Sequence, residues 1–259
     1  MRKYSAQIAN VAAFLLMLLM NGLANGLPIN GKTTGEISDA FPVLFTPAPM
    51  TFVIRGVIYL LLLAYVIYQI LPAQHTALFQ QQIGLWFVIS CCLNAAWRFC
   101  WHYEQFVPTL LIMLGLLVSL WAIYRRLHIG RRTVPPLEWW FVHLPFSAYF
   151  GWISVATIAN LTIVLATCGL GNLGLPPVLF TSLLMLFAEG LGIFMATHRN
   201  EMVYPLVIVW ALIGIARRHH TTHISLSVIA AILASALVMV IVIVKLKNNG
   251  GRFPKIRAL

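Results

Sequence analysis

Long apolar segments separated by short polar connections dominate the sequence and predict its elements. A transmembrane helix needs about 20 predominantly apolar residues, and eight segments meet or approach this length. The seventh is short for a complete crossing, so it predicts either a short span or a re-entrant helix that would leave seven spans. We expect an all-α polytopic membrane protein with spans at about 6–26, 50–71, 83–103, 107–127, 138–166, 175–196, 202–217 and 224–246.

Two of these segments carry a stripe of aromatic and amide side chains along one face. At about 100° per residue, each stripe covers roughly 80° of its helix. An amide that faces lipid costs free energy unless it finds a hydrogen-bond partner, so both stripes predict a buried wall that either packs helices together or lines a ligand pocket. The stripes are Trp86, Asn94, Trp97, Trp101 and Glu104, with Arg98 at the margin, in the third segment, and Tyr149, Trp152, Ala156 and Asn160 in the fifth.

The composition and charge exclude a soluble nucleic-acid-binding protein. The chain is 61% hydrophobic and 9% charged, with a mean hydropathy of +0.89, whereas soluble domains contain about 25% charged residues. The net charge of +11 comes from basic residues clustered between apolar segments, as the positive-inside rule describes. We therefore expect a multi-pass protein of the cell membrane, with membrane lipids and no nucleic acid among its partners.

The basic clusters also predict the orientation. With eight spans, the N-terminus, residues 125–132, residues 198–199 and the C-terminal tail lie on the cytoplasmic side. The pair Arg217 and Arg218 would then lie outside, against the rule.

Histidines and cysteines show no metal-site pattern. The four cysteines lie in or at the ends of apolar segments without ligand spacing, and we interpret them as reduced core residues. His219, His220 and His223 share about one helical turn, but no acid or cysteine accompanies them. We interpret them as part of a solvated loop and expect no metal site.

The longest connection, residues 27–49, is too apolar to be a free loop. Its four prolines and its Asn30-Gly31 turn signal exclude a simple helix. We expect segment 30–49 to cover the outer mouth of the bundle as a lid, with Phe41 or Phe45 turned inward. A passive linker is the alternative.

Arg55 lies near the outer end of the second segment, close to Phe52 and Tyr59. An arginine there either extends to the membrane surface or pairs with an acid. Its candidate partners are Glu104, Glu36 and Asp39.

These residues resemble the motifs of the tryptophan-rich sensory protein (TspO/MBR) family, the bacterial relatives of the mitochondrial translocator protein. The family's third helix carries Leu-Asn-x-x-Trp followed by aromatics, and its fifth carries Trp with Ala four and Asn eight residues on. Arg55 stands where the family has a second-helix tryptophan. The resemblance covers about residues 6–166, so we predict a family-like domain at 1–166 and additional helices with a basic tail at 167–259. The matching residues are Leu93, Asn94, Trp97, Phe99 and Trp101, and then Trp152, Ala156 and Asn160.

The resemblance implies a five-helix bundle with a tryptophan-lined pocket near one membrane face, covered by the first loop. The implied ligands are porphyrin, haem and related tetrapyrroles, or sterol-like lipids, and no cofactor is obligatory. We expect the pocket between the first, second, third and fifth segments. The residues assigned to it are Phe52, Arg55, Tyr59, Asn94, Trp97, Trp101, Tyr149, Trp152, Ala156 and Asn160.

Three functions compete, and a binding or sensor protein for such ligands ranks first. The alternative is a secondary transporter of a hydrophobic or amphipathic small molecule, for which Glu189 in the sixth segment is a candidate ion relay. A membrane enzyme, with His102 or His143 as an acid–base group or haem ligand, ranks last, and we assign no catalytic residue. We expect residues 167–259 to pack outside the five-helix core with Glu189 at that seam, and we keep a homodimer as a candidate assembly.

Overall fold

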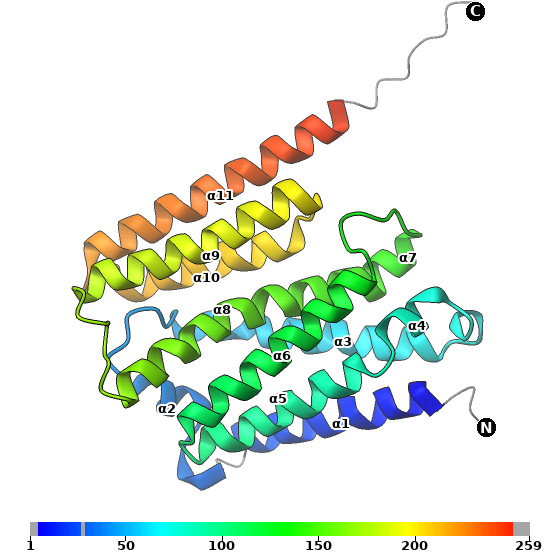
Figure 1. Cartoon of the computed structure of the whole chain (residues 1–259), viewed down its shortest axis with the longest axis horizontal. Coiled ribbons are helices and arrows are strands. Elements are labelled where there is room, and N and C mark those ends of the chain that lie inside the picture. Colours follow the sequence, from blue (N-terminus) through cyan, green and yellow to red (C-terminus); the bar gives the residue numbers. More distant parts are fainter. Residues whose placement is uncertain (1–4, 27–28, 251–259) are drawn as a thin grey trace, which may run out of the picture.

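The computed structural model describes residues 5–26 and 29–250, and every regular element among them is a helix. This result confirms the predicted all-α class. The long helices run side by side and reverse direction at each connection (Figure 1). They are α1 (Ser5–Gly26), α3 (Ile54–Ile70), α5 (Trp86–His102), α6 (Phe106–Arg126), α8 (Leu144–Thr167), α9 (Pro177–Arg199), α10 (Val203–His219) and α11 (Ile224–Gly250).

Short helices connect the long ones. Those between α1 and α3 build the lid, and a π-helical turn precedes α8. They are η1 (Ile29–Gly31), α2 (Thr34–Asp39), η2 (Pro49–Val53), η3 (Pro72–Gln74), α4 (Leu78–Ile83), α7 (Pro136–Glu138) and the π-helical η4 (Trp139–His143).

Helix length and composition make this a multi-pass membrane protein. Six helical segments of the described chain are long and apolar enough to cross a membrane. The helices α5 and α10 have 17 residues each, which is near the lower limit of about 17 for a span. The weak seventh segment forms α10, which extends alongside α9 (Figure 1).

The buried core is continuous between the first five long helices and the last three. Of the last three long helices, α10 provides most of the contact with α8. The aromatic rings of Phe150 and Tyr204 lie 5.1 Å apart across this seam. Gly151 permits the close approach, because a Cβ there would lie 3.1 Å from both the Tyr204 carbonyl oxygen and the Val207 Cβ.

Arg218, one of the two arginines that depart from the positive-inside rule, contacts the lid at one end of the bundle. The start of α1 and the end of α11 lie at one end of the bundle, whereas α2 and the end of α10 lie at the other (Figure 1). Arg218, near the end of α10, pairs with Asp39 of α2 at 2.8 Å and donates a hydrogen bond to the Pro47 carbonyl at 3.4 Å. This arginine therefore serves as a contact to the lid, whatever its effect on orientation.

Candidate ligand-binding site

A cavity of about 240 Å³ lies at the lid end of the bundle. All ten side chains that the sequence assigned to a pocket line this cavity, so the two predicted stripes meet at one shared space, although Trp86 and Glu104 of the first stripe do not line it. They are Phe52, Arg55 and Tyr59 from η2 and α3, Asn94, Trp97 and Trp101 from α5, and Tyr149, Trp152, Ala156 and Asn160 from α8.

The set of helices around the cavity differs from the predicted one. Among the α1 side chains that the structure describes, none lines it, whereas α6 contributes Met113 and Leu116. The helix α1 packs against α5 and supports the wall indirectly, because the Asn21 amide donates to the Asn94 side-chain oxygen at 2.8 Å. The Asn94 amide in turn donates to the Tyr149 hydroxyl at 2.8 Å.

The tryptophans form an oriented aromatic wall. The rings of Trp97 and Trp101 stack with centroids 5.0 Å apart, and Phe52 meets Trp152 edge to face at 5.7 Å. The Trp97 indole N–H donates to the Asn160 side-chain oxygen at 2.9 Å. A hydrogen bond of this kind fixes the plane of the Trp97 ring, so the wall presents an oriented aromatic surface to the cavity.

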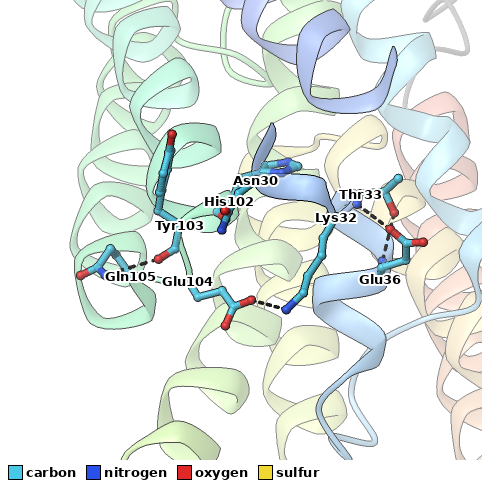
Figure 2. A network of polar contacts seen from close by, with 8 residues as sticks. All are labelled: Asn30, Lys32, Thr33, Glu36, His102, Tyr103, Glu104 and Gln105. Carbon is cyan, nitrogen blue, oxygen red and sulfur yellow. Dashed lines mark hydrogen bonds and ion pairs between the residues drawn. The ribbon is translucent and has the colours of Figure 1, made fainter. Parts of the chain in front are cut away.

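The lid is attached to the end of α5 (Figure 2). Lys32 forms an ion pair with Glu104, and the Asn30 amide donates to the His102 carbonyl at 3.1 Å. Within the lid, Thr33 and Glu36 cap α2 through reciprocal hydrogen bonds. The bonds from the Thr33 backbone and hydroxyl hold the pKa of the Glu36 carboxyl below its ordinary value. The capping explains why a helix forms within this proline-containing connection.

The lid lines the cavity with polar and small residues, and its two phenylalanines pack elsewhere. Neither Phe41 nor Phe45 lines the cavity. Phe45 is buried in the main core, and Phe41 packs edge to face on Phe106 with ring centroids 5.0 Å apart. Both rings therefore anchor the lid. The lid residues that line the cavity are Thr34, Gly35, Ser38, Asp39, Thr46, Pro47 and Pro49.

Arg55 does not pair with any of its three expected acids. Glu104 binds Lys32, Asp39 binds Arg218, and Glu36 caps α2. Arg55 donates instead to the side-chain oxygen of Asn21 at 2.8 Å.

Asn21 belongs to the hydrogen-bond network of the site and was not predicted from the sequence. Its side-chain oxygen also accepts from the Tyr59 hydroxyl at 2.8 Å and from Arg98 Nε at 2.8 Å. A second Arg98 nitrogen donates to the Thr34 hydroxyl of the lid. An amide within an apolar segment was the available signal, because such a group requires polar partners.

The end of α10 binds the last part of the lid. His219 is 4% exposed, and its Nε2 lies 2.8 Å from the Leu44 carbonyl oxygen. The Trp210 indole donates to the Thr51 carbonyl at 2.9 Å. The interpretation of His219 as part of a solvated loop is therefore wrong. No group of three or more metal-ligating side chains occurs in the described part of the chain.

The remaining candidate residues lie outside the cavity. Glu189 is 6% exposed, and no hydrogen bond or ion pair of its carboxylate is found among the described residues. Glu201, a second buried acid, accepts hydrogen bonds from the Val203 and Tyr204 backbone at 2.8 Å. Burial raises the pKa of Glu201. Of the histidines, His102 is buried with its Nε2 3.1 Å from the Thr34 hydroxyl, and His143 is buried near the opposite end of the bundle.

Comparison with known families extends the similarity beyond residue 166. A family model described as a TSPO-like protein matches residues 7–244, which include α9, α10 and most of α11. No curated protein and no solved structure matches the chain. Since the family model covers most of the sequence, the chain belongs to the TSPO-like protein family.

Proposed function

We propose that this protein binds a tetrapyrrole such as porphyrin or haem, or a sterol-like lipid, in the cavity between α3, α5 and α8, and senses it in the cell membrane. Membership of the TSPO-like family supports a membrane-embedded binding or sensor protein in general. The observation that carries the proposal is the convergence of Trp97, Trp101 and Trp152 on one cavity. Stacked indole rings with fixed planes suit a flat, largely apolar molecule.

The cavity is too small to hold a macrocycle unless one of its walls, such as the lid, moves. A volume of about 240 Å³ is below the range of about 300–1,000 Å³ that is typical of small-molecule sites. A macrocycle therefore requires the cavity to widen. The lid is the wall segment that lies outside the long helices, so we assign the opening movement to it.

Removing one tryptophan from each stripe tests the proposal. We expect Trp97→Ala and Trp152→Ala each to weaken protoporphyrin binding on the order of 30-fold, because truncating a central aromatic contact costs about 2 kcal/mol or more. Tryptophan quenching and the Soret band of purified protein, titrated with protoporphyrin and with haem, measure the affinity. The matched control is Trp140→Ala, since Trp140 is 57% exposed and lies outside the cavity. Equal affinity in all four proteins would place the ligand elsewhere.

Transport is the second candidate, because Glu189 is a buried acid without a described polar partner. Glu189 does not line the cavity, so we expect Glu189→Gln to leave protoporphyrin affinity within about twofold of wild type. Reconstituted vesicles with an imposed pH gradient provide the second measurement. Wild-type uptake that follows the gradient and disappears in Glu189→Gln, with folding intact, would favour the transporter over the sensor.

A further inference from the structure

Two arginines of the cavity share one amide oxygen and have no acidic partner. The Asn21 side-chain oxygen lies 2.8 Å from Arg55 Nη2 and 2.8 Å from Arg98 Nε. Arg98 is 1% exposed, although its second Nη group has no described partner. The ion pairs in the described part of the chain are Lys32 with Glu104 and Arg218 with Asp39.

The charge around the cavity is therefore unbalanced. Its lining contains Arg55, Arg98 and Arg218 but a single acid, Asp39. Since Arg218 neutralises Asp39, the positive charge of the other two arginines stays uncompensated. Two unpaired cations within a membrane-spanning bundle repel each other and lose hydration. An anion at this position would relieve both costs.

The Asn21 side-chain oxygen also has more hydrogen-bond donors around it than it has lone pairs. A carbonyl oxygen has two lone pairs, yet the Asn21 oxygen lies within hydrogen-bond distance of Arg55, Arg98 and the Tyr59 hydroxyl. Of the two arginines, Arg55 has more freedom to move, because its guanidinium is only partly buried, whereas Arg98 is 1% exposed. If Arg55 turned to an incoming anion, fewer donors would compete for this oxygen, and Arg98 and Tyr59 would still be hydrogen-bonded to it.

We propose that Arg55 and Arg98 form an anion subsite that binds a carboxylate or phosphate group of the ligand while its apolar body lies against Trp97 and Trp152. This assignment rests on the proposed function of the cavity and narrows its ligand to an amphipathic anion. A guanidinium binds such groups through charge-assisted, often bidentate hydrogen bonds. Neutral sterol-like lipids lack the group that this subsite recognises.

Two matched ligand pairs test the subsite. Protoporphyrin has two carboxylates, and its dimethyl ester has the same ring without the charges. Lysophosphatidate has a free phosphate monoester, whereas in lysophosphatidylcholine the phosphate is also esterified with choline. Binding of all four to the full-length protein is measured in neutral detergent by tryptophan quenching and by the shift in unfolding temperature.

We expect the wild type to bind protoporphyrin on the order of tenfold to a hundredfold more tightly than its dimethyl ester. Arg55→Gln should remove this preference, because it lowers the affinity for protoporphyrin to that for the ester. Arg125→Gln is the control, because Arg125 lies against Trp121 at the opposite end of α6. A preference for lysophosphatidate over lysophosphatidylcholine that Arg55→Gln also removes would identify a lipid phosphate as the anion.

The outcomes separate the two proposals. Equal binding within both ligand pairs, or preferences that survive in Arg55→Gln, would overturn the anion subsite, while binding of the porphyrin ester would still support a tetrapyrrole pocket. If neither porphyrin binds, the tetrapyrrole proposal fails. The subsite then stands if lysophosphatidate raises the unfolding temperature of the wild type and not of Arg55→Gln, and falls if it raises both equally or neither.

Discussion

Gly214→Leu is expected to accelerate both entry and release of a ligand on the order of tenfold. Gly214 lies on α10 where the lid passes into α3, and its carbonyl accepts from the Ala48 N–H at 3.0 Å. A Cβ at this glycine would collide with the Thr51 side chain and lie 2.9 Å from the Pro47 Cβ. Since Pro47 is a lid residue that lines the cavity, the larger side chain must push the lid outward.

The contacts around Gly214 hold the lid against α10. His219 and Arg218 bind the Leu44 and Pro47 carbonyls, and Arg218 also pairs with Asp39. A larger side chain between α10 and the lid weakens several of these contacts together, so it shifts the lid toward an open position. Rates in both directions then rise, and the affinity changes less than either rate.

Stopped-flow quenching with protoporphyrin measures the two rates. Gly190→Leu is the matched control, because a Cβ at Gly190 would meet nothing within 4 Å. If Gly214→Leu has the unfolding temperature of the wild type and its rates of ligand entry and release are unchanged, ligands enter by a route other than the contact between α10 and the lid.

The architecture was predictable from the sequence because it depends on local patterns. Each long helix corresponds to one apolar segment, and even the short seventh segment forms α10. The two aromatic stripes were also visible in the sequence, because aromatic and amide residues recur at helical spacing around Trp97 in one segment and around Trp152 in another. Polar groups on such a face are costly in lipid, so the face was expected to be buried.

The polar pairing around the cavity was not predictable, because it joins residues far apart in the chain. Charge alone suggested acids as partners for Arg55, whereas the fold brings it to the amide of Asn21. The role of His219 depends on a contact with Leu44 that is 175 residues away in sequence. Hydrophobicity likewise predicts that Phe45 is buried, but it does not show that the ring packs in the main core and not at the cavity.

Asn21→Leu is expected to destabilise the protein by about 3 kcal/mol or more. The substitution keeps a similar volume but removes the oxygen that accepts from Arg55, Tyr59 and Arg98. Leaving a buried charged donor unsatisfied costs more than losing a neutral hydrogen bond. The substitution also removes the donor to Asn94, so the cavity wall loses its support from α1.

Asn10→Leu on the same helix is the matched control, because its amide donates only to neutral groups, Gln69 at 2.9 Å and Tyr65 at 3.4 Å. Asn10 is 3% exposed and Asn21 is 4% exposed, so burial is similar, and the two variants differ in the number and the charge of the hydrogen-bond partners that they lose. We expect this control to lose about 1–3 kcal/mol. Reversible unfolding in mixed micelles compares the two variants with the wild type. If the Asn21 variant loses no more stability than the control, the two arginines have another acceptor, and the shared oxygen does not hold them.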